Sequence, residues 1–131
     1  MTGHKERTSI LVVGGGPAGA TAANDLAMRG HDVVLLDKAG RIKPCGGAIP
    51  PRAIEDFDIP AEQICARIRS ARMIAPSDKG VDMPIESGFV GMVDREHFDE
   101  WLRFRASENG ATRVTGTFDD VERNADGTVT V

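Results

Sequence analysis

The run from Ile10 to Thr21, ILVVGGGPAGAT, constrains the fold more than any other part of the chain. Four aliphatic residues typical of a buried strand pass directly into Gly-x-Gly-x-x-Gly and then into small residues typical of a closely packed helix. Gly14 would form the sharp turn, Gly16 would let a pyrophosphate approach the backbone, and Gly19 would let the helix pack tightly on the strand. The N–H groups and the dipole of the helix N-terminus would then face the phosphates. We interpret the run as a dinucleotide-binding cradle.

The residues after the glycines supply the context that this motif needs. We expect a helix over residues 17–29, because proline is favoured in the first turn and Gly30 would end the helix. Residues 32–37 then predict a second buried parallel strand. Asp37 stands at the carboxyl end of that strand, where an acid accepts hydrogen bonds from an adenosine ribose. A glycine-rich turn beside a solvated acid is the less favoured alternative.

The rest of the chain alternates between short helical and strand patterns. Residues 38–51 form a long non-periodic segment rich in glycine, proline and cations, and long ordered loops are usually functional. Proline positions, alternation and turn residues predict the following elements. They are short helices at 51–57 and 60–68, a hairpin at 71–75 and 81–85, a strand at 89–93, a helix at 95–109 capped by Asp94 and ended by Gly110, a strand at 112–117, and a hairpin at 118–123 and 128–131.

Composition excludes several classes of function. The chain has 131 residues, enough for one domain with a real core, and a net charge of −4 with acids and bases interspersed. Because no basic patch is interleaved with aromatics, nucleic acid is a poor candidate partner. No apolar run approaches the ~20 residues that cross a bilayer, and the polar start lacks a secretory signal. We therefore expect a cytoplasmic protein, with peripheral membrane contact left open.

The chain has two cysteines, Cys45 and Cys65, and three scattered histidines. Without an export signal a structural disulfide is not expected, so we treat both cysteines as thiols. The spacing of these residues does not match that of metal ligands, so we predict no metal site. We expect Cys65, on the predicted helix at 60–68, to belong to the core.

Three blocks of the sequence resemble the N-terminal part of the geranylgeranyl reductase family of FAD-dependent oxidoreductases. Residues 13–20, VGGGPAGA, are shared by many FAD proteins. Residues 43–50, KPCGGAIP, are more specific and resemble the chlorophyll and bacteriochlorophyll branch. Residues 93–102, VDREHFDEWL, resemble a helix of FAD reductases and related monooxygenases. The resemblance covers the chain from Ser9 to about Val121.

This resemblance implies an activity. Members of the family reduce double bonds of a geranylgeranyl chain, carried on a pigment or on a diphosphate, to give a phytyl chain. NADPH is their usual reductant, and FAD passes the reducing equivalents to the polyprenyl chain. The resemblance also implies that any peripheral membrane contact would be at the photosynthetic membrane. It says nothing of the oligomeric state.

The predicted fold is α/β, a Rossmann-like FAD/NAD(P)-binding domain of the glutathione-reductase or aromatic-hydroxylase type, with a parallel sheet and β-hairpin additions. Residues 1–8 would be a flexible N-terminus and residues 9–131 the N-terminal part of this domain. Because the chain ends inside or just after a predicted strand, we expect a fold that is incomplete at its C-terminus. The substrate domain and further FAD contacts would lie beyond Val131. We therefore expect the chain alone to hold FAD weakly, if at all, and to be inactive.

Motif and resemblance together predict the residues that bind the cofactor. Arg41 would screen phosphate charge or be an ordinary solvated cation. By resemblance, Arg95 faces the ribityl or phosphate region of the flavin. The full predicted set is Gly14, Gly16, Pro17, Ala18, Gly19, Asp37, Lys38, Arg41, Gly46, Gly47 and Arg95.

Cys45 is the candidate catalytic residue. Gly46 and Gly47 would let the backbone of this loop lie close to a flat ring while the thiol points into the site. The thiol would then orient the substrate alkene or donate a proton beside the flavin. A small buried filler is the alternative interpretation, and the family resemblance favours the catalytic one. His97 and Trp101 are given no role.

Three other functions remain open at this point. The first is another FAD enzyme of the same scaffold, an aromatic monooxygenase or an electron-transfer flavoprotein reductase, which the block around Cys45 fits less well. The second is a non-enzymatic prenyl-binding protein, which would not need an intact cradle with Asp37 and Arg95. The third is a simple NAD-binding domain, for which the loop around Cys45 is longer than necessary.

Overall fold

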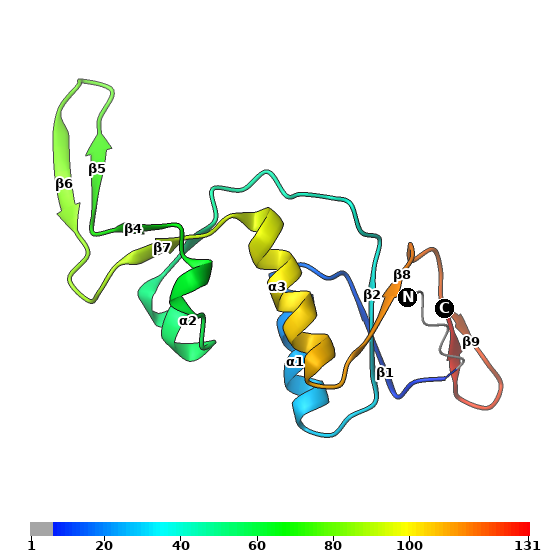
Figure 1. Cartoon of the computed structure of the whole chain (residues 1–131). Helices are drawn as coiled ribbons and strands as arrows, with labels where there is room; N and C mark the ends of the chain where they lie inside the picture. The colour runs from blue at the N-terminus through cyan, green and yellow to red at the C-terminus, as the bar shows by residue number, and fades with distance from the viewer. Residues whose placement is uncertain (1–6) are drawn as a thin grey trace. The chain divides into compact units, whose positions relative to one another are not determined.

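The computed structural model describes residues 7–131 and divides the chain into two compact units (Figure 1). The first unit contains the chain up to Arg41 together with Asp99–Val131, and the second contains Ile42–Phe98. The boundary falls inside helix α3 (Arg95–Glu108).

A three-stranded parallel sheet forms the centre of the first unit. Its order is β1 (Ile10–Val13), β2 (Val33–Asp37), β8 (Thr112–Thr115). Both pairings are parallel, with Ile10 opposite Val33 and Val34 opposite Thr112. The central strand β2 carries the apolar run that a strand flanked by neighbours on both sides requires. The parallel strands predicted at 32–37 and 112–117 are therefore confirmed, with slightly shorter ends.

Two helices connect these strands. Helix α1 (Pro17–Met28) links β1 to β2, and α3 precedes β8. Because such crossovers are right-handed and the chain steps twice in the same direction across the sheet, both helices lie on one face of it (Figure 1). The Asn109 amide donates to Oδ1 of the buried Asn24 at 2.7 Å, which joins the two helices near their C-terminal ends.

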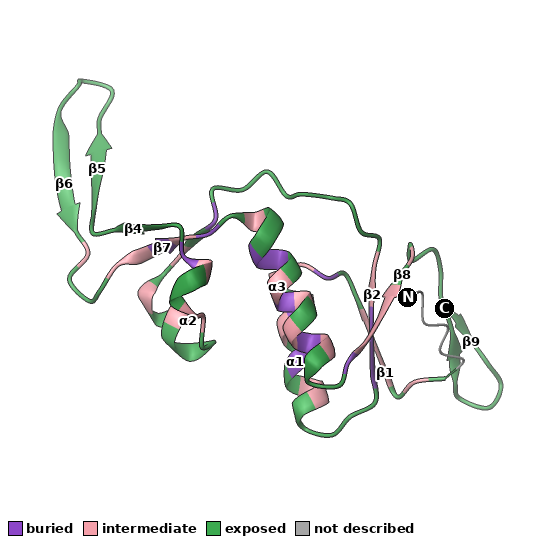
Figure 2. Ribbon diagram, viewed as in Figure 1, coloured by how far each residue is buried: buried purple, intermediate pink, exposed green. Residues whose placement is uncertain are grey.

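The core of the first unit lies between the sheet and these helices. Val33 and Leu35 of β2 are fully buried, and small residues of α1 and one face of α3 pack in the same layer (Figure 2). The spacing of the buried α3 residues is that of a helix face. The buried apolar side chains of the described part of this unit are Ala20, Ala23, Val33, Val34, Leu35, Leu102, Ala106 and Ala111.

The ends of the helices follow the predicted signals. Pro17 begins α1, and Gly30, at a φ of 85°, lies just beyond its end. The carboxylate of Asp94 accepts the N–H of Glu96 at 3.1 Å and so caps α3. Gly110, at a φ of 111°, ends this helix as predicted.

The second unit contains a small antiparallel sheet and a hairpin. The sheet has the order β3 (Ala48–Ile49), β7 (Val90–Met92), β4 (Ala66–Ile68). Strands β5 (Ser70–Ile74) and β6 (Gly80–Pro84) form the hairpin that the sequence predicts. Helix α2 (Pro51–Asp56) is also confirmed, and a 3₁₀ turn occupies Ala61–Gln63. In the first unit, β9 (Glu122–Arg123) and β10 (Val129–Thr130) form the last hairpin.

One predicted helix is wrong. Only Ala61–Gln63 of the segment 60–68 is helical, as a 3₁₀ turn, and Ala66–Ile68 forms strand β4. Pairing with β7 overrides the weak local helical preference, because each strand residue gains hydrogen bonds to a neighbour. The prediction that Cys65 belongs to the core is also wrong: Cys65 is exposed, and its N–H donates to the Met92 carbonyl at 2.8 Å.

Two further expectations bear on the ends of the chain and on membranes. Within residues 7–131, no helix is long and apolar enough to cross a bilayer. Residues 1–6 of the flexible segment predicted at 1–8 lie outside the described part, so that expectation stays a prediction.

The burial of Leu35 gives a direct test of the core. Leu35 is 1% exposed, so Leu35→Ala leaves a cavity at the centre of the sheet. We expect a loss of about 2–5 kcal/mol in the free energy of unfolding, measured by urea denaturation. The control Val129→Ala, at a side chain that is 55% exposed, should change this free energy by less than about 0.5 kcal/mol. Equal losses in both variants would contradict the assigned core.

Candidate dinucleotide-binding site

The glycine cradle has the geometry that the motif predicts. Gly14 has a φ of 98°, and its N–H donates to the Leu36 carbonyl at 2.8 Å, which fixes the turn to the end of β2. A Cβ on Gly19 would overlap the carbonyl oxygen of Gly14, so α1 packs against the turn as only glycine allows. A Cβ on Gly16 would meet no atom within 4 Å. The backbone at Gly16 is therefore open to a ligand.

The first turn of α1 presents backbone donors beside this opening. Gly16 is the N-cap residue and makes no side-chain capping bond. Pro17 takes the first helical position, where the missing N–H costs nothing. Because the positive end of the helix dipole lies here, the turn suits the negative charge of a pyrophosphate.

Asp37, at the end of β2, connects to this turn through both carboxylate oxygens. Oδ2 accepts the N–H of Gly15 at 2.8 Å, and Oδ1 accepts the N–H of Ala39 at 2.9 Å. Partial burial raises the pKa of Asp37, but these two hydrogen bonds and the cations Arg103 and Arg113 outweigh it and hold the pKa below its usual range. Asp37 is therefore ionised at neutral pH and suited to accept hydrogen bonds from ribose hydroxyls.

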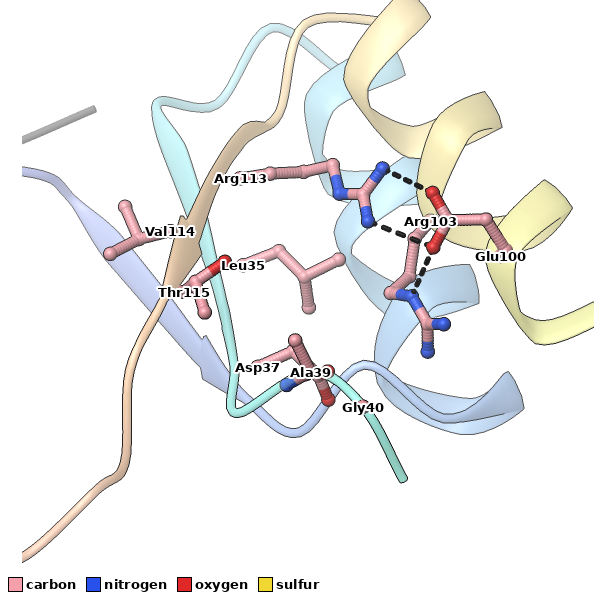
Figure 3. Close-up of a pocket in the computed structure, with 9 residues that line it drawn as sticks. All are labelled: Leu35, Asp37, Ala39, Gly40, Glu100, Arg103, Arg113, Val114 and Thr115. Carbon is pink, nitrogen blue, oxygen red and sulfur yellow. Dashed lines mark hydrogen bonds and ion pairs between the residues drawn. The ribbon is translucent and has the colours of Figure 1, made fainter. Parts of the chain in front are cut away.

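A cluster of three charged side chains lies next to Asp37 (Figure 3). Arg113 of β8 donates to both oxygens of Glu100, at 2.8 and 3.0 Å. Arg103 donates from Nε to Glu100 at 3.0 Å and from Nη1 to the Gly15 carbonyl at 2.8 Å. Hydrogen bonds from Arg113 and then Arg103 lower the pKa of Glu100 against its partial burial. The cluster thus connects α3 and β8 with the glycine turn.

A pocket lies at the carboxyl ends of β2 and β8, where ligands bind in open α/β sheets (Figure 3). Two acids, two cations and apolar strand residues are among the residues that form its walls. The ionised Asp37 of this pocket and the open backbone at Gly16, in the turn that Asp37 contacts, fit the adenosine and pyrophosphate of a dinucleotide. The lining residues are Leu35, Asp37, Ala39, Gly40, Glu100, Arg103, Arg113, Val114 and Thr115.

The structure brings part of the predicted site together within the first unit. Gly14, Gly16, Pro17, Ala18, Gly19 and Asp37 form the turn and the strand end described above. Lys38 and Arg41 follow Asp37 in the chain and are exposed. Their contact with a cofactor stays a prediction.

The other predicted residues, Cys45, Gly46, Gly47 and Arg95, fall in the second unit. Cys45 is exposed rather than a buried filler, and its sulfur accepts the N–H of Gly47 at 3.4 Å. Gly47 has a φ of 68°, and a Cβ there would overlap the carbonyl of Val93. Close packing within this unit thus explains Gly47. The catalytic role of Cys45 and the cofactor contacts of Gly46, Gly47 and Arg95 stay predictions.

Sequence reasoning missed Gly15 and the cluster of Glu100, Arg103 and Arg113. A Cβ on Gly15 would lie 2.8 Å from Cδ of Arg103 and 3.0 Å from Cβ of Asp37. The available signal was that Gly15 makes residues 14–16 three consecutive glycines, although the middle position of Gly-x-Gly does not require glycine. Arg113 gave no local signal, since it meets Glu100 only through the pairing of β8 with β2.

These features define the class of protein. The parallel βαβ unit, the close approach of Gly19 and the acid at the end of β2 are those of an FAD/NAD(P)-binding Rossmann-type domain. Residues 8–125 match the family described as pyridine nucleotide-disulphide oxidoreductase. The chain belongs to this family.

Curated relatives agree with the resemblance seen in the motifs. The geranylgeranyl diphosphate reductase of Rhodobacter capsulatus is 65% identical over 121 residues, which cover 92% of this chain and 31% of that protein. The chloroplastic geranylgeranyl diphosphate reductase of Arabidopsis thaliana is 42% identical over 113 residues, covering 83% and 24%. The predicted resemblance to geranylgeranyl reductases is confirmed. The chain spans less than a third of the length of these relatives.

Solved structures confirm the fold class. A geranylgeranyl bacteriochlorophyll reductase-like protein from Thermoplasma acidophilum superposes with a TM-score of 0.72 at 30% identity, over 81% of this chain and 29% of that one. A flavin-dependent brominase gives a TM-score of 0.71 at 21% identity, over 91% and 32%. At that identity the brominase shares the fold alone.

The lowered pKa of Asp37 predicts how stability depends on pH. A carboxyl whose pKa is depressed in the folded state stabilises the fold above its unfolded pKa, and this contribution is lost as the pH falls through the folded pKa. Asp37→Asn removes the contribution, so the variant should be less stable near neutral pH. The difference from wild type should shrink as the pH falls below about 3.8. Urea denaturation across a pH series measures it.

The control for this series is Asp119→Asn, at an exposed carboxylate of the same unit. We expect this variant to follow wild type at every pH. A stability difference for Asp37→Asn that grows toward low pH would contradict the assigned electrostatics.

Proposed function

We propose that this chain is the FAD-binding, N-terminal part of an NADPH-dependent geranylgeranyl reductase. The observation that carries the proposal is 65% identity to a geranylgeranyl diphosphate reductase across a cradle whose geometry fits a dinucleotide. The enzyme would saturate double bonds of a geranylgeranyl chain, on a pigment or a diphosphate, in chlorophyll or bacteriochlorophyll synthesis. It would act in the cytoplasm or at the surface of the photosynthetic membrane.

In this proposal the first unit holds the adenosine diphosphate half of FAD. The backbone at Gly16 and the first turn of α1 bind the pyrophosphate, and the ionised Asp37 accepts hydrogen bonds from the ribose hydroxyls. Lys38 and Arg41 lie beyond the strand end and add positive charge against the phosphates. When bound, FAD supplies the hydride-transfer chemistry that no side chain offers.

The loop at 43–50 supplies the proposed catalytic group. The exposed thiol of Cys45 orients the substrate alkene or donates the proton that accompanies hydride transfer. Gly46, without a side chain, lets the loop approach a flat ring. Arg95, half-buried at the start of α3, binds the ribityl or phosphate region.

The first test uses the full-length polypeptide, meaning the whole protein of which this chain forms the N-terminal part. The purified protein is mixed without oxygen with NADPH and a geranylgeranylated pigment, and its absorbance is followed. We expect bound flavin that bleaches with NADPH and recovers on addition of the pigment, whose mass rises in two-hydrogen steps. Bound flavin that recovers only with oxygen, and leaves the pigment unchanged, would indicate a monooxygenase instead. Absence of flavin would indicate a prenyl carrier.

Cys45 is tested by Cys45→Ala in the same protein. We expect FAD retention and NADPH-dependent bleaching to persist, because the cradle lies in other residues. Reoxidation by the pigment should slow by about 10²-fold or more, the typical effect of losing a proton donor. The matched control is Cys65→Ala, since this exposed thiol donates to the Met92 carbonyl at 3.2 Å within the small antiparallel sheet and its loss should leave the rate unchanged. A Cys45→Ala enzyme as fast as wild type would remove the catalytic assignment.

A further inference from the structure

We propose that Arg103 is a positioning residue of the cradle, which holds the peptide group between Gly15 and Gly16 in the orientation that binds the dinucleotide. The inference rests on the proposed binding of FAD and assigns to α3 a part in it. Gly15 is buried between the end of β2 and α3. Its N–H donates to Asp37 and its carbonyl accepts from Arg103, both at 2.8 Å.

These two bonds fix more than Gly15 itself. A peptide group is planar and trans, so the carbonyl of Gly15 and the N–H of Gly16 point in opposite directions from one rigid plate. When Arg103 holds the carbonyl, the direction of the Gly16 N–H is set at the N-cap of α1. When Gly15 N–H holds Oδ2 of Asp37, the carboxylate stays at the pocket. Arg103 thereby orients the peptide group between Gly15 and Gly16, while Asp37 holds the N–H of Gly15.

Arg103 is itself held firmly enough for this role. Its side chain is 17% exposed, and its Nε donates to Glu100, which Arg113 grips through both oxygens. The guanidinium uses separate nitrogens for Glu100 and for the Gly15 carbonyl. A lysine ammonium carries one nitrogen on a flexible stem and does not reproduce this fork.

The packing at Gly15 supplies a second, independent reason for the pair. A Cβ at this position would lie 2.8 Å from Cδ of Arg103, a distance at which the arginine must move. A side chain at position 15 and the arginine at position 103 therefore compete for one space. Arg103, together with Asp37 at 3.0 Å, leaves no room for a side chain at position 15.

The test measures FAD affinity of the flavin-free full-length polypeptide by fluorescence titration. Arg103→Ala should weaken binding by about 10- to 100-fold, the range of a lost hydrogen bond to a charged donor. Arg103→Lys should not restore the FAD affinity. Wild-type affinity in this variant would overturn the claim that the separate nitrogens of the guanidinium are needed. Arg29→Ala, at an exposed arginine of the same unit, is the matched control and should bind as wild type.

A double-mutant cycle tests the packing. Gly15→Ala should weaken FAD binding by crowding both Arg103 and Asp37, and only the part due to Arg103 should vanish in Arg103→Ala, so adding Gly15→Ala to Arg103→Ala should cost less than it does in wild type. Independent, multiplicative effects would overturn the coupling.

A pH profile separates positioning from a merely structural role. The charged groups facing Asp37 are Arg103 and Glu100 from α3 and Arg113 from β8. Removing the Arg103 cation should raise the pKa of Asp37, so FAD affinity of Arg103→Ala should begin to fall at a higher pH than in wild type. If FAD affinity begins to fall at the same pH in Arg103→Ala as in wild type, the proposal is overturned.

Failure of the proposed function can be distinguished from failure of the role given to Arg103. If the wild-type protein binds no FAD, the proposed function fails. The role of Arg103 is then tested by ¹³C NMR titration of the Asp37 carboxyl in wild type and in Arg103→Ala. A higher pKa of Asp37 in Arg103→Ala supports the positioning role, and an unchanged pKa overturns it.

Discussion

The hydrogen bond from the N–H of Gly15 to Asp37 joins two segments that are 22 residues apart in the chain. It exists because parallel pairing brings the carboxyl ends of β1 and β2 to the same edge of the sheet. At that edge the turn after β1 and the acid after β2 form one site, and the close contact of Gly19 with Gly14 places the N-terminus of α1 beside it. The pocket, the charge cluster and the proposed cofactor site all depend on this junction.

At this junction the negative charges of Asp37 and Glu100 lie close to the positive charges of two arginines. Asp37 is partly buried and stays ionised because backbone donors and two arginines stabilise its negative charge. Glu100 in turn holds both arginines, so positive charge remains near Asp37 without an arginine binding its carboxylate directly. Both oxygens of Asp37 keep further lone pairs for ribose hydroxyls. A strand-end acid thus needs support from α3 and β8, which follow it by more than fifty residues.

Sequence alone predicted the parts of this account that local patterns encode. The strands β1, β2 and β8, the helices α1 and α3 and the glycine turn all carry strong periodicity or end signals, such as Pro17 and Gly110. The segment 60–68 failed because β4 is defined by its partner β7, which lies more than twenty residues away. Glu100, Arg103 and Arg113 were missed for the same reason: on the sequence they are ordinary surface charges, and only tertiary contacts give them a role.

The central claim is that the cradle binds the adenosine diphosphate half of a flavin dinucleotide. The most direct measurement compares FAD with FMN, which carries the same isoalloxazine ring and one phosphate but lacks the adenosine monophosphate part. The flavin-free full-length polypeptide is titrated with each, and bound flavin is followed by fluorescence quenching. We expect FAD to bind and FMN to bind at least about 100-fold more weakly, a difference of about 2.7 kcal/mol. Equal affinity for the two flavins would contradict it.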